Sequence, residues 1–590
     1  MTLDLKKHKD DLLFLPLGGA NEIGMNLNLY HLNGKWLMVD LGVGFASNVP
    51  GVDMLTPNIN FIKNNKKNLL GIVLTHIHED HLGAVQYLWE DLQVPIYASP
   101  LASNFLLAKL SEFKLDRKVE IHIIKPNENL NIGPFSIEFI GLTHSVPEMK
   151  ALIINNSVGK ILHTGDWKFD PDPVVGEVSD KARIAELGNN NDILAVICDS
   201  TNALSEGHSR SEGELYDSIK SLIVGRKGLV GVTTFASNIA RIYTIAKIAK
   251  EVGRKVVLLG YALHRICEVG KKSGYFDQDF DFISDRQMKS FKKDEILVLC
   301  TGCQGEAMAS ARKIATDNHP SVRFHKGDLM IFSSKIIPGN EKKIFELFDL
   351  MAKKQIDVIT EKDHFVHVSG HPSQQELAEL YRLAKPKIAI PVHGEFLHTK
   401  AHCEIALANG VEKVLQTENG LVIRITKDGC EKIGFVESGY LAVDGKQLVD
   451  LNSDILRERR KIAETGIIII ALTINEKLRI NGDIAIRSVG CYDFKKEEDV
   501  LIDLQKEIRK IVNEKLKILE KTLGTEEEQG SIFNLSFLKK KNPKKAKKLN
   551  SGKINEEIAK TIRGRVIKII EQLKGKRPAV EVFINFTNNY

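Results

Sequence analysis

The chain has 590 residues, of which 43% are hydrophobic and 27% charged, with a formal net charge of +6. This length exceeds what one hydrophobic core can hold and predicts about three or four domains of ordinary globular composition. Seven scattered cysteines argue against a disulfide framework and for a reducing cytoplasm. No apolar run reaches membrane-spanning length and no secretion signal is recognisable, so a cytoplasmic protein without a membrane partner is expected.

A β-hairpin is predicted near the start of the chain. Strand-like segments at 26–30 and 35–39 flank Asn33-Gly34, the preferred pair for a tight type I′ turn. The second strand ends in Asp40, whose carboxylate either orients a metal-bound histidine or caps a turn.

The strongest chemical signal is T-H-I-H-E-D-H-L-G at 75–83. An aliphatic run at 69–74, typical of a buried strand, precedes it, so these histidines lie at the carboxyl end of a strand, where open α/β sheets bind ligands. Three imidazoles and a carboxylate this close are costly to gather unless a cation binds them, and Zn²⁺ favours such donors. Alternation allows one pair to face one ion and the other pair a second ion. The four residues are His76, His78, Asp80 and His81.

Two later strands end in further candidate ligands. His144 follows an alternating strand predicted over 135–140, and Asp166 follows a strand beginning at 160. A single histidine or aspartate at a strand end is more often structural, but both repeat the geometry of the first group.

The middle of the chain alternates strands with helices. Buried-type strands are predicted at 228–232, 255–260, 296–302 and 329–334, with a helix over 239–252. This alternation is typical of a parallel sheet and predicts an inserted domain over 206–364.

The last part is predicted to be a separate small α/β domain. A linker over 446–465 precedes an alternating strand at 466–472, an amphipathic helix at 499–519 and a helix–strand unit over 554–586. Seven lysines within 539–548 are interpreted as a solvated loop that can add salt-sensitive affinity for a nucleic acid.

In their order along the chain, these motifs resemble the metallo-β-lactamase family. The match consists of Asp40, the H-x-H-x-D-H run, His144 and Asp166. The resemblance implies a four-layer αββα sandwich with two metals at one edge. It implies one ion on His76, His78 and His144, a second ion on Asp80 and His81, and Asp166 bridging the two.

Further motifs resemble the β-CASP branch of that fold, and the ribonuclease J family in particular. They include D-S-T-N-A at 199–203, T-T-F-A-S-N at 233–238, H-V-S-G-H at 367–371 and P-V-H-G-E at 391–395. Asp199, His371 and His393 match its three motifs, and His393 would complete the second ion's ligands. The implied α/β architecture has a metallo-β-lactamase domain in two parts, 1–205 and 365–445, a β-CASP insertion at 206–364, the linker at 446–465 and a C-terminal domain at 466–590.

The resemblance also implies an activity, a metal-dependent ribonuclease acting in RNA maturation and decay. It would digest RNA 5′-to-3′ from 5′-monophosphate ends and also cut internally. Two Zn²⁺ per subunit are implied, or Mn²⁺ in their place. The C-terminal domain would support homodimers or homotetramers.

The same resemblance assigns roles to individual residues. His371 would be the general acid, oriented by Asp199, with Asp80 as a third catalytic residue. Single-stranded RNA would be gripped near its 5′ end by Ser237 and by His367, Val368, Ser369, Gly370 and His371.

Two other functions account for fewer of these motifs. A lactamase-fold hydrolase of small thioesters or lactams leaves Asp199, His371, His393 and the inserted domain unexplained. A catalytically weak RNA-binding scaffold of the same fold conflicts with the complete set of candidate ligands.

Overall fold

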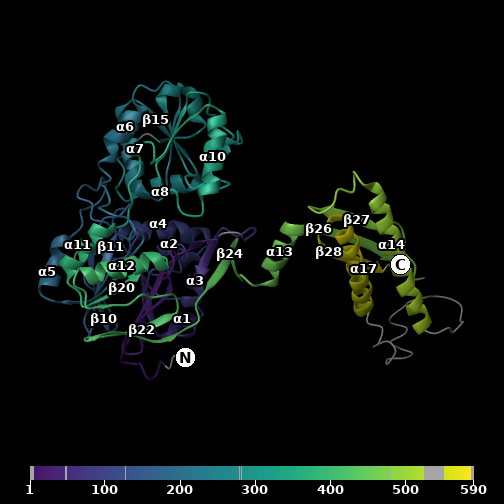
Figure 1. Ribbon diagram of the computed structural model, residues 1–590, viewed down its shortest axis with the longest axis horizontal. Helices are drawn as coiled ribbons and strands as arrows, with labels where there is room; N and C mark the ends of the chain where they lie inside the picture. The colour runs from purple at the N-terminus through teal and green to yellow at the C-terminus, as the bar shows by residue number, and fades with distance from the viewer. Residues whose placement is uncertain are drawn as a thin grey trace. The chain divides into compact units, whose positions relative to one another are not determined.

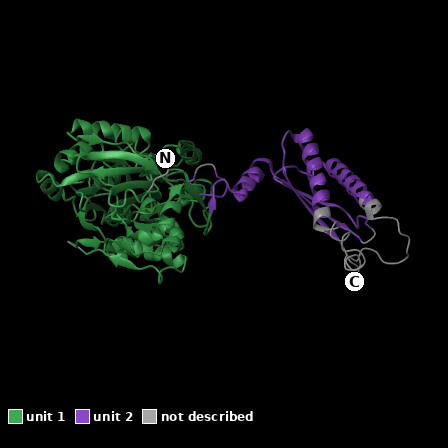
Figure 2. Ribbon diagram, turned by 90° about the horizontal axis from the view of Figure 1, so that it is seen from below, with its two compact units in different colours: residues 1–45, 54–448 green, residues 46–53, 449–590 purple. Residues whose placement is uncertain are grey.

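The computed structural model describes residues 5–46, 49–125, 128–277, 280, 282–475, 478–523 and 551–586. They form two compact units, one comprising 1–45 and 54–448 and the other 46–53 and 449–590 (Figure 2). The lysine run at 539–548 lies outside the described residues.

Two β-sheets packed face to face form the centre of the first unit. The eight-stranded sheet has the order β23-β22-β1-β2-β3-β6-β7-β8 and the seven-stranded sheet the order β21-β20-β13-β12-β11-β10-β9. The first sheet contains β1 (Leu12–Gly18), β2 (Leu27–Leu32), β3 (Lys35–Val39), β6 (Leu69–Val73), β7 (Ile96–Ala98), β8 (Ile121–Ile123), β22 (Leu421–Thr426) and β23 (Gly429–Phe435). The second contains β9 (Leu130–Ile132), β10 (Phe135–Gly141), β11 (Lys150–Asn155), β12 (Lys160–His163), β13 (Ile193–Asp199), β20 (Ile388–Val392) and β21 (Lys413–Val414).

Alternation along β1 explains how the layers form. Leu12 and Phe14 pack in the core between the two sheets, whereas Leu13 and Leu15 pack on the opposite face. Helices α1 (Asn60–Asn64), α3 (Val85–Leu92) and α4 (Pro100–Glu112) cover that opposite face. Helices α5 (Lys181–Asn189), α11 (Gln374–Ala384) and α12 (Phe396–Ala408) cover the second sheet. The expected αββα sandwich is confirmed.

The predicted hairpin is also present. β2 pairs with β3 in a register that places Leu32 opposite Lys35. Asn33 and Gly34 between them have φ of 51° and 72°, the left-handed conformation that a type I′ turn requires.

The inserted segment forms a separate six-stranded sheet with the order β16-β15-β17-β14-β18-β19 (Figure 1). All its pairings are parallel, as the alternation of strands and helices predicted. Its strands are β14 (Val230–Thr233), β15 (Lys255–Leu259), β16 (Phe282–Ile283), β17 (Ile296–Cys300), β18 (Leu329–Phe332) and β19 (Asp357–Ile359). Helices α6 (Leu215–Ile223), α7 (Ile239–Glu251) and α8 (Tyr261–Lys272) pack on one face, and α9 (Ser310–Ala315) and α10 (Glu341–Lys353) on the other.

The expected linker at 446–465 contains regular structure. Strand β25 (Gln447–Asp450) and helix α13 (Asp454–Thr465) occupy most of it, and Ser453 caps the helix through its hydroxyl. Strand β25 belongs to a small four-stranded sheet with the order β25-β24-β5-β4. In it, β24 (Tyr440–Asp444) pairs with β5 (Met54–Pro57), and β5 pairs with β4 (Gly44–Phe45). The boundaries at 205, 364 and 445 stay predictions.

The second unit is built on a three-stranded sheet, β27-β26-β28. Its elements are β26 (Ile467–Ile474), β27 (Ala485–Val489), α14 (Glu498–Leu523), α17 (Ser551–Lys574) and β28 (Ala579–Phe586). Ile468 and Ile470 of β26 are buried against apolar residues of α14 and α17, such as Ile508 and Ile562. The other face of the sheet leaves Val489 and Phe583 exposed. None of the described helices has the length and apolar character needed to cross a bilayer.

Candidate metal centre and active site

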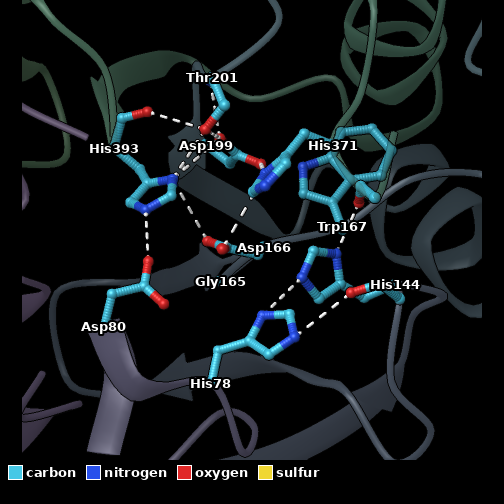
Figure 3. Close-up of polar contacts among 12 residues, drawn as sticks. His78, Asp80, His144, Gly165, Asp166, Trp167, Asp199, Thr201, His371 and His393 are labelled. Atoms are coloured by element: carbon cyan, nitrogen blue, oxygen red, sulfur yellow. Dashed lines mark hydrogen bonds and ion pairs between the residues drawn. The ribbon is translucent and has the colours of Figure 1, made fainter. Parts of the chain in front are cut away.

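The candidate ligands gather because their strands end at one edge of the sandwich. β12, β13 and β20 are parallel neighbours, and Asp199 at the end of β13 lies beside Val392, which precedes His393. Asp166 follows β12 after two residues. β3 and β6 are likewise parallel, so Asp40 and the histidine-rich segment leave the first sheet together. Figure 3 shows the resulting cluster, with Asp166 between His371 and His393.

Three overlapping groups of donors occur among the described residues, each with its ligand atoms within 4.8 Å of one another. Two of them match the predicted ligand sets, and all three share Asp166. The first is His76, His78, His144 and Asp166; the second is Asp80, His81, Asp166 and His393; the third is Asp166, Asp199, His371 and His393.

In the first group, hydrogen bonds to Nδ1 leave Nε2 of His76 and of His144 turned toward the cluster. Nδ1 of His144 lies 2.6 Å from the Gly370 carbonyl, which can only accept, so this nitrogen carries the proton. Thr75 donates to Asp40 and therefore accepts from Nδ1 of His76 at 3.0 Å. Nε2 of His76 is buried without a hydrogen-bond partner. An unpaired nitrogen of this kind is explained by a cation that accepts its lone pair.

The basicity of these rings fits that explanation. Burial lowers the pKa of His76 and His144 well below the ordinary histidine value, and lowers that of His78 to about 4. All three are therefore neutral near pH 7 and offer lone pairs, the form that binds metals.

In the second group, two carboxylates lie close to two histidines and control their protonation. Nε2 of His81 lies 3.1 Å from Asp166, and Nε2 of His393 lies 3.2 Å from Asp80. Burial alone would lower the pKa of both histidines, but the neighbouring carboxylates raise it well above the ordinary value. Among the described residues, the ion-pair partners of Asp80, Asp166 and Asp199 are all histidines, with no lysine or arginine. Such buried negative charge fits bound divalent cations.

Asp40 contacts both a candidate ligand, His81, and the residue that begins the histidine-rich segment, Thr75. Its Oδ2 lies 2.7 Å from Nδ1 of His81 and accepts from the Thr75 hydroxyl, while Oδ1 accepts from the Thr75 backbone N–H. Asp40 is fully buried and, like His393, has a positive φ, 64° against 51°. Both residues are therefore held in a sparsely populated backbone conformation, which is common at functional sites.

The third group contains the pair expected to act on the substrate. Nδ1 of His371 lies 2.7 Å from Oδ2 of Asp199. Burial alone would lower the pKa of His371, but the Asp199 carboxylate outweighs it and the pKa is raised. Asp199 therefore orients His371 and favours its charged form.

Two side chains of the site had no role predicted from the sequence. Thr201 donates to Asp199 at 2.7 Å and lies 2.8 Å from Nδ1 of His393, so it directs the other nitrogen of that ring toward Asp80. Asn26 contacts Nε2 of His81 at 3.0 Å. Thr201 is part of the D-S-T-N motif, which was the available signal. Asn26 carried no such signal, because the sequence marks it only as the first residue of a predicted strand.

The segment 367–371 lies beside the cluster, but its residues are not equivalent. Gly370 is in contact with His144 and His371 with Asp199. The Val368 side chain is buried in the hydrophobic core, so only its backbone can contact a ligand. Nδ1 of His367 is buried without a partner. Ser237 lies just before α7, and no hydrogen bond within the described parts of the chain joins it to the histidines.

Comparisons with known proteins agree with this geometry. Family models match residues 26–199 (metallo-beta-lactamase superfamily), 227–351 (ribonuclease J, beta-CASP domain), 355–415 (Zn-dependent metallo-hydrolase RNA specificity domain) and 454–529 (ribonuclease J C-terminal domain). The chain is 37% identical to Ribonuclease J of Sinorhizobium meliloti over 98% of its own length and 97% of that protein. It is 34% identical to Ribonuclease J 1 of Streptococcus pyogenes over 88% of its length and 93% of that protein.

A solved structure supports the fold alone. A protein of unknown function from Enterococcus faecalis aligns with a TM-score of 0.50 and 16% identity, covering 70% of this chain and 100% of that one. The sequence relatives, the matched domains and the three donor groups lead to the same assignment: this chain belongs to the ribonuclease J family.

Proposed function

We propose that the protein is a metal-dependent ribonuclease that hydrolyses RNA phosphodiester bonds. The observation that carries this proposal is the convergence, at one sheet edge, of two metal-type donor groups with a separate histidine–aspartate pair. The relatives named Ribonuclease J and the domain model named for RNA specificity support the substrate class. A scaffold that only binds RNA would not need complete donor groups.

The donor groups are suited to two divalent ions, Zn²⁺ or Mn²⁺. His76, His78, His144 and Asp166 would hold one ion, and Asp80, His81, Asp166 and His393 the other. When bound, the metals would supply Lewis-acid activation of water and of a phosphoryl oxygen. Neutral imidazoles accept Zn²⁺, and the mixed nitrogen and oxygen donors also accept Mn²⁺.

His371 would provide the proton for the leaving 3′ oxygen. Its Nδ1 is engaged by Asp199, which leaves Nε2 as the nitrogen that can serve a substrate. A raised pKa keeps this imidazole protonated at higher pH than usual, as a general acid requires.

The segment 367–371 would bind the 5′ end of single-stranded RNA. Its imidazoles, the Ser369 hydroxyl and the Gly370 amide are donors suited to a phosphate, and Ser237 would add a hydroxyl. A bounded pocket would favour a 5′-monophosphate over a triphosphate, and with it 5′-to-3′ digestion alongside internal cleavage. The seven cysteines are all free, which suits action in a reducing cytoplasm.

The second unit would join two copies of the chain. On the uncovered face of its sheet, Ile469 lies beside Arg487 on one strand and Glu581 on the other, near exposed Phe583. Glu581 already lies 3.7 Å from Arg563 of α17, and both side chains are largely exposed. The apolar face around Ile469 can pair with itself across a two-fold axis, with Arg487 of one copy added to the partners of Glu581 of the other. Homodimers, or homotetramers built from them, would result.

The decisive experiment uses one RNA prepared with either a 5′-monophosphate or a 5′-triphosphate and labelled at its 5′ end. Products are resolved over time with Zn²⁺ or Mn²⁺. Rapid release of labelled mononucleotide from the monophosphate form supports exonuclease action, and internal fragments from both forms support chiefly endonuclease action. His81→Ala should abolish cleavage, whereas His122→Ala, an exposed histidine on β8, should not. RNA binding without cleavage under either metal would refute the proposal.

A further inference from the structure

Residues 199–202 form a loop in which each consecutive side chain contacts a different partner. Asp199 contacts His371, and Thr201 contacts His393. The Ser200 hydroxyl contacts the buried ring of His402, which ties the loop to α12. The fourth residue, Asn202, is 8% exposed and reaches the segment 367–371. Asn202 therefore connects the loop that carries Asp199 to the segment proposed to grip RNA.

The orientation of the Asn202 amide follows from its partners. Nδ2 lies 3.1 Å from the carbonyl oxygen of His371 and 2.7 Å from Oγ of Ser369. A carbonyl oxygen can only accept, so the amide group that faces it must be the NH₂ and not the oxygen. The flipped amide would place two acceptors against each other. The NH₂ group consequently donates to Ser369 as well.

This arrangement determines what the Ser369 hydroxyl can do. Its oxygen accepts from Asn202 and also from the backbone N–H of His371 at 3.2 Å, and an N–H can only donate. A hydroxyl has two lone pairs and one hydrogen. Both lone pairs are occupied, so the hydrogen is left to donate to a third group. Ser369 is half-buried, and its neighbour Gly370 accepts a hydrogen bond from His144 of the metal centre.

We propose that Asn202 is a positioning residue that holds the Ser369 hydroxyl as an obligatory donor toward a phosphate oxygen of the RNA. This inference rests on the proposed ribonuclease function. An anionic phosphate oxygen is an acceptor without hydrogen, which is the partner that such a hydroxyl requires. The amide side chain is essential to this function. A carboxylate of the same shape would accept the hydrogen of Ser369 and turn it away from the substrate.

The test measures KM and kcat of the metal-loaded enzyme on a 5′-monophosphorylated RNA. In Asn202→Ala, KM should rise about 10-fold, the effect of losing one hydrogen bond to a charged group. The kcat value, the metal content and the thermal midpoint should stay near those of the wild type. Gln374→Ala is the matched control, because that amide holds the same loop through the Ala203 carbonyl without a hydrogen bond to Ser369. Its KM should not change.

A double-mutant cycle separates positioning from simple support of the fold. In a Ser369→Ala background, Asn202→Ala should raise KM much less than in the wild type, because the hydroxyl it positions is gone. Asn202→Asp keeps the shape of the side chain and should raise KM at least as much as Asn202→Ala. If Asn202→Ala does not fold, Asn202→Asp replaces it in the test.

Each other result has a definite meaning. Independent effects in the cycle, an unchanged KM or a loss of bound metal would overturn the assignment, as would failure of both Asn202 variants to fold. A wild-type enzyme that does not cleave RNA would instead refute the proposed function.

Discussion

Oδ2 of Asp199 lies 2.7 Å from Nδ1 of His371, although 172 positions of sequence separate the two residues. The same carboxylate accepts from Thr201 through Oδ1. Asp199 is thus fixed by its own loop while it orients a histidine from a distant segment. The pair suits the proton-donating role proposed for His371, because the carboxylate stabilises the charged imidazole.

We therefore expect His371→Ala to lose catalytic turnover by at least about 100-fold, the lower range for removing a general acid. Metal content, measured by atomic emission after dialysis, should stay near that of the wild type because the other two donor groups are intact. A marked loss of metal would reassign His371 as a ligand.

Asp40→Asn should weaken metal binding about 10- to 100-fold, the usual cost of losing a carboxylate behind a metal-bound histidine. Asp40 contacts Nδ1 of His81 and accepts from the backbone N–H and the hydroxyl of Thr75, so it would orient a ligand without being one. Competition against a chromogenic chelator measures the affinity. Tyr30→Phe is the control and should bind metal normally, since among the described residues its hydroxyl is hydrogen-bonded to His163, at 2.8 Å, and not to a candidate ligand. Equal affinities in the two variants would contradict a special role for Asp40.

Gly370→Ala should displace His144. A Cβ at this position would lie 2.7 Å from two atoms of the His144 ring, closer than any real contact. Because misplacement by about 1 Å can cost about 100-fold in rate, activity on RNA should fall by that order while the protein stays folded. Gly564→Ala, on α17 with open space around it, should leave activity unchanged and raise stability by up to about 1 kcal/mol. Full activity of Gly370→Ala would show that the His144 ring can move without consequence.

Asp170→Asn should destabilise the first unit by about 3–5 kcal/mol, because it leaves a buried lysine without its ion pair. The Lys168 ammonium lies 2.8 Å from Asp170, and their side chains are 2% and 1% exposed. Glu90→Gln is the control: its pair with Lys118 is more than half exposed, so the loss should be about 1 kcal/mol or less. Urea unfolding measures both, and similar losses would show that burial does not matter here.

The same pair predicts a pH dependence. Burial alone would raise the pKa of Asp170, but Lys168, Ser211 and the Glu212 N–H together lower it below the ordinary value. The stabilisation is therefore fully present above the unfolded-state pKa of about 3.9 and is lost as the pH falls through the lower, folded-state value. The stability difference between the wild type and Asp170→Asn should stay constant from neutral pH down to about pH 4 and narrow only below it. If the stability difference between the two proteins already decreased near pH 6, the titrating group would be a histidine and not Asp170.

Phe583→Lys should dissociate the proposed dimer. Phe583 is 56% exposed on the uncovered face of the three-stranded sheet, where a charge would oppose its burial against a second copy. Light scattering coupled to gel filtration should show half the wild-type mass. Phe435→Lys, at a residue 50% exposed on β23 of the other unit, is the control and should leave the mass unchanged. A wild-type protein that is already monomeric would remove the dimer proposal.

Features whose interactions lie within a few residues could be predicted from the amino-acid sequence. The Asn33-Gly34 turn, the buried strand before His76, the helix beginning at Ile239 and the alternating pattern of β26 were all predicted and are present. Periodicity and turn chemistry depend on neighbouring residues, so they can be read without the fold. The ligand types were also evident, because six residues hold three histidines and one aspartate.

The arrangement of those ligands depends on how the sheets pack and could not be predicted from local sequence. The parallel register of β12, β13 and β20 brings Asp166, Asp199 and His393 to one edge, and no local pattern specifies that register. The hydrogen bonds of Thr201 to His393 and of Asn202 to Ser369 span 192 and 167 positions. Such partners are selected by the packing of whole sheets, because a side-chain hydrogen bond requires an atom at about 3 Å that only the folded chain can supply.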